Sequence, residues 1–221
     1  MCGRFVNADT DDAIEYFNIH ETSVHLAVSW DVRPTSQIGI IIDHTDTKPE
    51  QEPIRQLRGA RWGLIPSWST TLDKQRLLIN ARAETVLSKP SFRGAARHRR
   101  AIIPAQGYYE WTLNPDGSKT AFFLHNPDQP VLGFAGLYEW WHVPDTVTLP
   151  GMEDGWLCTA TIITRPAIDT LGHIHDRMPL IVPRPMCADW LDPAIAEVER
   201  IDTLIHAIPD PTLIPTRRAP A

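Results

Sequence analysis

Short runs of apolar and β-branched residues recur along the whole chain, whereas long amphipathic helical patterns are few. The runs are typical of β-strands, and they lie at residues 38–42, 61–64, 101–103, 121–124, 131–137, 156–164 and 180–182. Helices are expected from Thr10 onward and at residues 188–191 and 195–207. This balance predicts an α+β fold, with a curled, mostly antiparallel, barrel-like β-sheet and flanking helices.

Proline placement favours a single domain over residues 1–221. The twenty prolines of the 221-residue chain are spread over the predicted loops and are not gathered at one boundary. No internal repeat or low-complexity linker divides the sequence. Residues 114–117, Asn-Pro-Asp-Gly, predict a hairpin turn. The proline-rich residues 209–221 are expected to form a loose tail.

Several classes of protein are disfavoured by composition. No run of 18 apolar residues exists, so no transmembrane helix is expected. The first twelve residues, MCGRFVNADTDD, lack an apolar segment and argue against a secretory signal. The three cysteines, Cys2, Cys158 and Cys187, are too scattered for a disulfide framework or a CxxC zinc site. These features predict a cytoplasmic protein without membrane association.

The net charge of −6 conceals a strongly basic segment. Residues 55–100 hold eleven lysines and arginines but only two acidic residues, Asp73 and Glu84, so this segment carries +9 and the rest of the chain −15. Such a local excess suits an anionic ligand held against one face of the protein. A solvated, arginine-rich surface without a ligand explains the same pattern.

Cys2 carries chemistry that an internal cysteine lacks. Removal of Met1 would leave an α-amine with a pKa of about 7.7–8.0 beside a thiol with a pKa of about 8.5. This aminothiol can condense with an aldehyde through a Schiff base and close to a thiazolidine. Alternatively, the thiol can attack an amide carbonyl, as in N-terminal nucleophile hydrolases. A second-position cysteine without a role is the remaining interpretation.

Two further motifs offer proton-transfer groups. Glu110 lies between aromatic residues in QGYYEWT, and burial there would raise its carboxyl pKa towards neutrality. Without known partners, however, a strand carboxylate that faces water is the favoured interpretation. His175 lies in HIHDRMP, where it could act as a general acid or a structural histidine, or bind a metal together with His173. In an extended segment Asp176 would point away from His175, which leaves no third ligand, so no metal site is predicted.

Polar and aromatic residues in two other motifs suit nucleic-acid contacts. Asn80 and Arg82 in INARAET would share one face of an extended segment and could contact an oxyanion or a phosphate. Trp68 in WGLIPSW follows a proline turn and could stack on a base, although burial in the core explains Trp62 and Trp68 equally well.

Five motifs together resemble one known family. MCGRF, WGLIPSW, INARAET, PAQGYYEW and HDRMP occur in this order over residues 1 to about 190. They are similar to those of the SRAP family, the SOS-response-associated peptidase-like proteins that process abasic sites. Asp31 stands where family members often have asparagine, and Pro90 where they often have arginine.

The resemblance implies a role for particular residues. Cys2 corresponds to the nucleophile, Asn80 to a positioning residue, Glu110 to the acid/base, and His175 to the group that assists opening of the sugar ring. Positions that contact DNA or line its pocket match Arg4, Pro34, Trp68, Arg82 and Thr164, with Lys89 as a further phosphate contact.

The implied activity is covalent capture of damaged DNA. A family member would bind single-stranded DNA containing an abasic site, and Cys2 would form a thiazolidine cross-link with the ring-opened aldehyde. Autoproteolytic removal of Met1 and lyase-like chemistry at abasic sites are implied as well. No cofactor is expected, and the protein is expected to be a monomer in the cytoplasm, associated with the nucleoid when bound to DNA.

Two other functions remain open at the level of the sequence. A glutamine amidotransferase domain also begins Met-Cys-Gly and would use the same thiol on an amide, but HDRMP and GYYEW have no place in that mechanism. A non-covalent DNA-binding module would use the basic segment alone.

Overall fold

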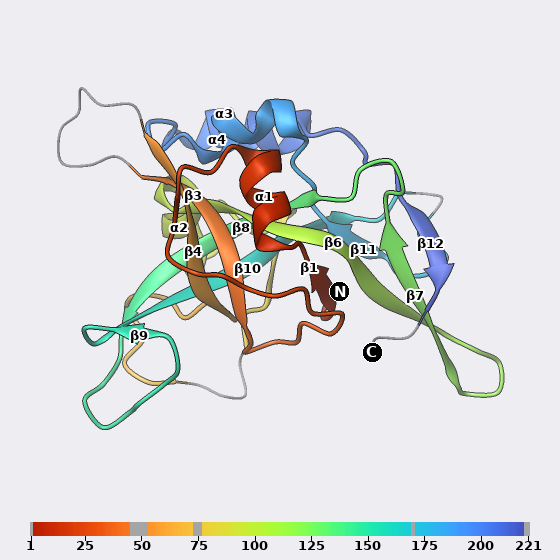
Figure 1. The fold of residues 1–221 in the computed structure, drawn as a ribbon, viewed down its shortest axis with the longest axis horizontal. Helices are drawn as coiled ribbons and strands as arrows, with labels where there is room; N and C mark the ends of the chain where they lie inside the picture. The colour runs from red at the N-terminus through yellow and green to blue at the C-terminus, as the bar shows by residue number, and fades with distance from the viewer. Residues whose placement is uncertain (1, 45–52, 73–76, 169–170, 219–221) are drawn as a thin grey trace.

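Strands are the main regular elements of the structure, a computed structural model that describes residues 2–44, 53–72, 77–168 and 171–218. Figure 1 shows a continuous sheet that curls on itself, with most helices gathered along one side. The longer strands are β3 (Gln37–His44), β4 (Ile54–Trp62), β6 (Arg100–Leu113), β7 (Lys119–His125), β8 (Leu132–His142) and β10 (Trp156–Pro166). The shorter ones are β1 (Phe5–Asn7), β2 (Glu21–Thr22), β5 (Asn80–Arg82), β9 (Met152–Glu153), β11 (Arg177–Pro179) and β12 (Ile214–Arg217).

Five of these strands close into a mixed β-barrel. β3 pairs antiparallel with β4 and, at Ile41 and Ile102, with β6. β6 pairs antiparallel with β8, and β8 with β10. A short parallel pairing between β10 and β4, at Thr159 and Arg61, completes the ring. The predicted single-domain α+β fold with a curled, mostly antiparallel, barrel-like sheet is therefore confirmed.

The barrel strands alternate between two apolar cores. Ile40 of β3 packs in the barrel core, whereas its neighbour Ile41 packs in the core under the helices, as the two-residue period of a strand requires. Phe5 of β1 also enters the barrel core, where its ring centroid lies 5.1 Å from that of Trp62 in an edge-on arrangement. β1 thereby brings the start of the chain against the barrel interior.

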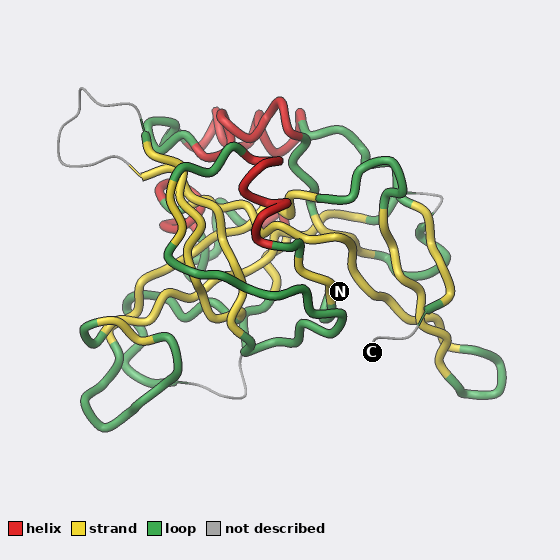
Figure 2. Tube along the Cα trace, in the orientation of Figure 1, coloured by secondary structure: helices red, strands yellow, loops and turns green. Residues whose placement is uncertain are grey.

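Four short α-helices cover the second core: α1 (Thr10–Phe17), α2 (Arg93–His98), α3 (Cys187–Leu191) and α4 (Val198–Ala207). Figure 2 shows α1, α3 and α4 on the same side of the strands. The helix predicted from Thr10 is confirmed, because α1 begins there and the Asp9 side chain caps it by accepting a hydrogen bond from the Asp11 N–H. No helix in the described ranges is long and apolar enough to cross a membrane.

Three segments differ from the predictions. The strand expected at 61–64 is part of β4, which starts at Ile54 and ends at Trp62. The strand expected at 180–182 is replaced by β11 just before it, with only a single bridge between Phe134 and Ile181. Part of the tail expected to be loose forms β12, which pairs antiparallel with β7 at the edge of the sheet. An edge strand tolerates Pro215, which has no N–H to donate.

Candidate functional site

Cys2 lies inside the protein, held by the pairing of β1 with β6. Phe5 is paired with Tyr108, and the Tyr109 N–H donates a hydrogen bond to the Arg4 carbonyl at 2.9 Å. The Cys2 side chain is fully buried, with its Sγ 4.0 Å from the Arg4 carbonyl oxygen. Burial raises the pKa of the Cys2 thiol far above its ordinary value, and the nearby charge of Glu110 raises it further. The thiol is therefore protonated at neutral pH.

Asn80 fixes the backbone of Cys2 from a strand far away in the sequence. β5 pairs in parallel with β10, Asn80 opposite Ile162, and this pairing places the Asn80 side chain beside the start of the chain. The Asn80 amide nitrogen donates to the Cys2 carbonyl oxygen at 2.8 Å. The Asn80 amide oxygen is buried and accepts no hydrogen bond within the described structure. An acceptor of this kind is available to a donor on a bound molecule.

Glu110 and His175 face each other next to Cys2. Glu110 lies on β6 and is buried, which raises its pKa to about 7. Its Oε2 is 3.9 Å from Nε2 of His175. Burial also lowers the pKa of His175 below its ordinary value, so the imidazole is neutral at pH 7. The pair can therefore exchange a proton with a ligand near neutrality, as general acid–base chemistry requires.

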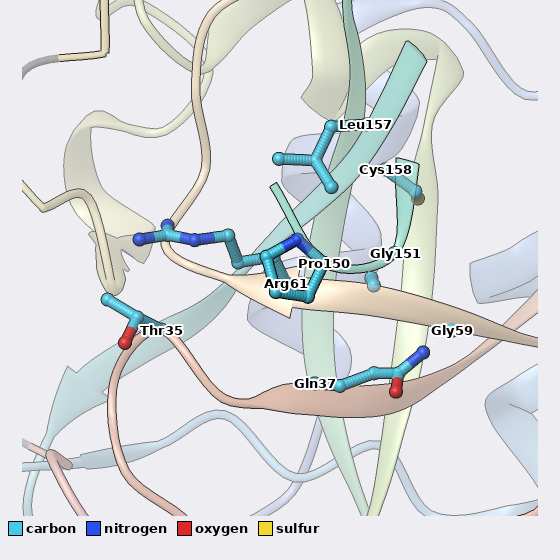
Figure 3. A pocket seen from close by; sticks show the side chains of 9 residues that line it. Thr35, Gln37, Gly59, Arg61, Pro150, Gly151, Leu157 and Cys158 are labelled. Atoms are coloured by element: carbon cyan, nitrogen blue, oxygen red, sulfur yellow. The ribbon is translucent and has the colours of Figure 1, made fainter. Parts of the chain in front are cut away.

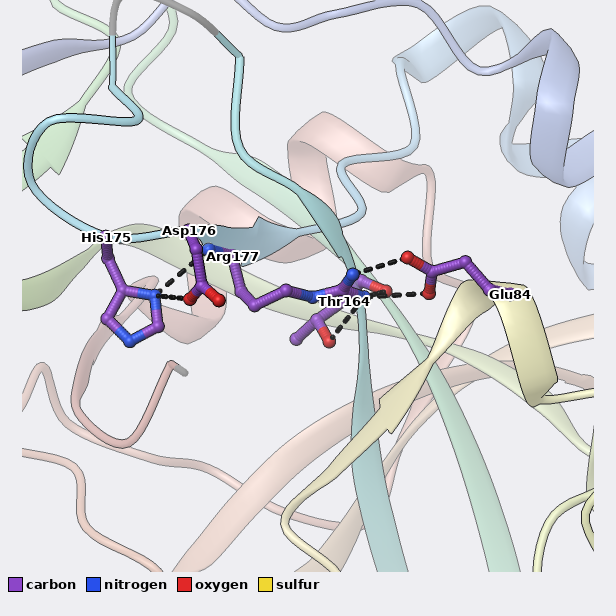
Figure 4. Close-up of polar contacts among 5 residues, drawn as sticks. All are labelled: Glu84, Thr164, His175, Asp176 and Arg177. Carbon is purple, nitrogen blue, oxygen red and sulfur yellow. Dashed lines mark hydrogen bonds and ion pairs between the residues drawn. The ribbon is translucent and has the colours of Figure 1, made fainter.

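The loop before β11 sets the orientation of His175 (Figure 4). His175 Nδ1 accepts a hydrogen bond from the Arg177 N–H at 3.0 Å and lies 2.8 Å from Oδ1 of Asp176. The expectation that Asp176 points away from His175 was wrong, because the segment bends here instead of running extended. When Nδ1 accepts, the proton of the neutral ring is on Nε2, which faces Glu110.

The buried Arg177 and the exposed Glu84 form an ion-pair clamp behind His175 that sequence reasoning missed. The Arg177 guanidinium donates to both carboxylate oxygens of Glu84 and, at 2.7 Å, to the Thr164 carbonyl (Figure 4). This bidentate pair lowers the pKa of Glu84. Glu84 belongs to a 3₁₀ turn, η1 (Ala83–Thr85), directly after β5. The clamp thus ties the strand that carries Asn80 to the segment that carries His175.

Comparison with known proteins assigns the chain to a family. The model of the family described as "SOS response associated peptidase (SRAP)" matches residues 1–217. The chain belongs to the SRAP family. Among curated relatives of this SRAP protein, "Abasic site processing protein YoqW" of Bacillus subtilis is 36% identical over 211 residues, which cover 93% of this chain and 87% of the relative. YobE of the same organism, with the same description, is 34% identical and covers 93% and 88%.

More distant relatives and solved structures agree with this assignment. "Abasic site processing protein HMCES" of Gallus gallus is 33% identical over 153 residues, covering 62% of the SRAP chain and 46% of the relative. A crystal structure of a Bordetella bronchiseptica protein superposes with a TM-score of 0.77 at 24% identity, covering 99% and 100% of the two chains. One from Bacteroides thetaiotaomicron gives 0.76 at 24% identity, covering 93% and 86%. These two likenesses concern the fold alone.

Of the residues expected at DNA, Arg4 and Pro34 lie close to the start of the SRAP chain. Arg4 forms an ion pair with Asp31 at 2.7 Å, and its guanidinium lies 5.9 Å from the ring centroid of Trp111. Arg33 pairs with the other oxygen of Asp31. Asp31 thus anchors two arginines of this loop. Pro34 follows in a half-exposed turn.

The other expected DNA contacts fall into two groups. Trp68 is 67% exposed, and Arg82 and Lys89 are exposed as well, so all three are accessible to a ligand. Thr164 is fully buried, and its hydroxyl lies 3.4 Å from an Arg177 nitrogen. A buried position of this kind does not suit a direct DNA contact. Thr164 instead supports Arg177.

The basic segment does not form one continuous face. Several of its arginines are bound to partners within the SRAP fold: Arg55 to Asp43, Arg58 to Glu153, Arg99 to Glu139, and the buried Arg100 to four backbone carbonyls. Lys74 and Arg76 lie outside the described residues. Only part of the +9 charge is therefore available to a ligand. In the described part of the chain, no cluster of three or more His, Cys, Asp or Glu side chains could hold a metal ion.

Proposed function

We propose that this SRAP protein captures abasic sites in single-stranded DNA as covalent adducts of its N-terminal cysteine. The observation that carries the proposal is the pairing of the buried Glu110 with the partly exposed His175, 3.9 Å apart beside Cys2. The relatives described as abasic site processing proteins support the substrate. An abasic deoxyribose is an aldehyde in its ring-opened form. An aminothiol reacts readily with an aldehyde, because its amine and its thiol both bond to the same carbon.

Maturation is the first requirement of this chemistry. The α-nitrogen of Cys2 is part of a peptide bond until Met1 is removed, and it becomes a nucleophilic amine afterwards. We assign this removal to the chain itself: the Cys2 thiol attacks the Met1 carbonyl, the Cys2 nitrogen leaves as the amine while a thioester forms, and water hydrolyses the thioester to release methionine and the free thiol. The hydrogen bond from Asn80 to the Cys2 carbonyl holds the residue in place during both steps.

Capture of the abasic site then proceeds by ring opening, formation of an iminium and closure of the thiazolidine. The protonated form of His175, a minority at neutral pH, donates the Nε2 proton to the ring oxygen of the sugar and takes back the proton of the anomeric hydroxyl, so the ring opens to the aldehyde with no net change in protonation. The neutral amine of Cys2 adds to the aldehyde carbon, and protonated Glu110 gives its proton to the departing hydroxyl, so water leaves and an iminium remains. The Glu110 carboxylate takes the proton from Sγ as sulfur adds to the same carbon. The product is a thiazolidine, and one water is lost overall.

Proximity and burial account for the rate and for the protection of the strand. Nitrogen and sulfur belong to one residue, so the ring closure is intramolecular. Because the thiol is protonated at neutral pH, it needs the carboxylate of Glu110 beside it as a base. Closure of the ring removes the iminium that β-elimination requires, and the DNA strand stays intact.

The test is a denaturing gel and an intact mass after incubation with an abasic single-stranded oligonucleotide. We expect a covalent adduct whose mass is the sum of the mature protein, lacking Met1, and the oligonucleotide, minus one water. Cys2→Ala should abolish the adduct completely. Cys187→Ala is the matched control, because Cys187 is also a buried free cysteine but packs under the helices; it should form the adduct at the normal rate.

Three outcomes would contradict the proposal. Adduct formation by protein that retains Met1 would show that the free α-amine is unnecessary. Glutaminase activity without any adduct would instead indicate an N-terminal nucleophile amidohydrolase, and a gel shift that does not survive denaturation would indicate a non-covalent DNA-binding module.

A further inference from the structure

A pocket whose lining does not include Cys2 lies on the barrel wall (Figure 3). It contains about 400 Å³ of free space, part of it open to solvent. Residues from β3, β4, β10 and the loop before β9 line it: Thr35, Gln37, Gly59, Arg61, Pro150 and Cys158. The pocket forms where β4 lies between β3 and β10, which are its neighbours in the barrel.

Arg61 is the unusual side chain in this pocket. Its Nη1 is buried and has no hydrogen-bond partner anywhere in the described structure. Burial lowers the pKa of Arg61, and among the described residues no acidic side chain offsets this effect. Arg55 and Arg99, from the same basic segment, are paired with Asp43 and Glu139. A half-buried cation without a counter-charge is unfavourable, and an anion in the pocket would remove this cost.

The walls of the pocket are held in place by close packing and by a strained backbone. A Cβ on Gly59 would lie 2.7 Å from Nε2 of Gln37, so glycine leaves room for the Gln37 amide across the strand. Thr35 has φ = 76°, a conformation that β-branched residues rarely adopt. The Thr35 N–H donates to the Trp62 carbonyl at 2.8 Å and keeps this turn in register with β4. Strain of this kind is often retained at ligand sites.

We propose that this pocket binds a phosphate-type oxyanion, with Arg61 supplying the charge and the Thr35 hydroxyl, on the same side of the pocket in Figure 3, supplying a hydrogen bond. The pocket adjoins the candidate DNA site through the chain itself. Thr35 follows Pro34, and Trp62, next to Arg61, donates through its indole nitrogen to the carbonyl of Ile79, the residue before Asn80. Under the proposed function, the oxyanion is a phosphodiester of the captured strand, outside the lesion. A free phosphate ion has the same chemistry.

The experiment separates these two sources and avoids the covalent step. In a Cys2→Ala background, affinity for an undamaged single-stranded oligonucleotide is measured by fluorescence anisotropy as a function of salt. In parallel, thermal melting is followed in phosphate and in chloride at equal ionic strength. Arg61→Gln is compared with Arg58→Gln, a control on the same strand whose arginine is already paired with Glu153 and stacked near Trp140.

For a DNA phosphate, we expect Arg61→Gln to weaken oligonucleotide binding about fivefold and to reduce the salt slope by about 0.7, the value for one contact to a single strand. Arg58→Gln should change neither. For a free ion, phosphate should raise the melting temperature of the parent protein but not of Arg61→Gln, and DNA affinity should be unaffected. If Arg61→Gln alters neither DNA binding nor the response to phosphate, the proposal is wrong.

A second variant keeps the test valid if Arg61→Gln does not fold. Thr35→Gly relieves the positive φ and removes the hydroxyl, so it should fold at least as stably as the parent and still lose part of the same binding. The site would be overturned if Thr35→Gly and Arg61→Gln both kept full DNA binding with a normal salt slope and the full response to phosphate. Failure of adduct formation at Cys2, with the Arg61 effects intact, would overturn only the covalent mechanism.

Discussion

The candidate site at Cys2 and the basic segment 55–100 differ in how closeness along the sequence relates to closeness in the folded structure. The site draws Cys2, Asn80, Glu110 and His175 from four distant segments and brings them together through β1, β5, β6 and the loop before β11. The basic segment is contiguous in sequence, yet its arginines end in separate ion pairs, a helix-capping position and a pocket. In a closed barrel, strand pairing decides which side chains meet, and nearness along the chain says little about it.

The largest expected effect on the cross-linking rate comes from a change at Glu110, which acts together with residues from distant segments. Glu110→Gln keeps the shape and hydrogen-bonding capacity of the side chain but cannot transfer a proton. We expect cross-linking to abasic DNA to slow by about 100-fold or more, the usual scale of general acid–base catalysis. Non-covalent affinity for undamaged single strands should stay within twofold. Single-turnover gels and anisotropy measure the two quantities.

The pH dependence sharpens this prediction. Protonated Glu110 donates the proton in the dehydration step, and with a pKa of about 7 it loses that proton as the pH rises through neutrality. The ratio of wild-type to Glu110→Gln rates should therefore be greatest near pH 6 and fall towards pH 8.5. A constant ratio over this range would remove Glu110 from the proton-transfer steps.

The motifs that carry reactive residues were easier to predict than the residues that hold them in position. Burial of Glu110 was one of two interpretations that the aromatic residues beside it left open, and the strand pattern predicted the barrel-like sheet. The Glu84–Arg177 clamp could not be found, because its two residues lie 93 positions apart and meet only through the pairing of β10 with β5 and β11. Nothing in the local pattern of either residue distinguishes a member of an ion pair from a solvated charge.

The misplaced elements have similar physical causes. β4 begins with Ile54 and continues through the half-buried polar residues Arg55 and Gln56, because one face of a barrel wall looks outward. These polar residues hide the first half of the strand. β12 contains Pro215, which signals a loop in isolation, but the strand pairs along a single edge with β7. In both cases a tertiary contact overrides the local propensity.

The two tryptophans of WGLIPSW show the same difference: they are close in sequence but lie in different surroundings in the structure. Trp62 is fully buried and donates to the Ile79 carbonyl, whereas Trp68 is 67% exposed. Trp62→Ala should lower the free energy of unfolding by about 3–5 kcal/mol. Trp68→Ala should leave stability within about 0.5 kcal/mol but weaken single-strand binding by about 1–3 kcal/mol, the contribution of one stacked base. Denaturant melts and anisotropy check each variant, and a stability loss at Trp68 with normal binding would contradict its assignment.

The smallest effects are expected for variants of two arginines in the basic segment. One arginine stabilises the fold, and the other is expected to bind the ligand. Arg100 is buried, and its guanidinium donates to the carbonyls of Trp190, Ala96, Arg97 and Asp192. Arg100→Met removes these donors and leaves carbonyls unpaired, so we expect a loss of about 2 kcal/mol in unfolding free energy. Its DNA affinity, measured where the variant is folded, should be normal.

Arg82 is the counterpart, exposed at the end of β5 two residues after Asn80. Arg82→Ala should keep the stability of the parent, because no ion pair is lost from the surface. Its affinity for single strands should fall a fewfold irrespective of sequence, with a salt slope reduced by about 0.7. Arg200→Ala, an exposed arginine on α4, is the control for a general loss of charge. Equal effects of Arg82→Ala and Arg200→Ala would mean that net charge, and not the position of Arg82 beside the Cys2 site, determines how this protein holds its strand.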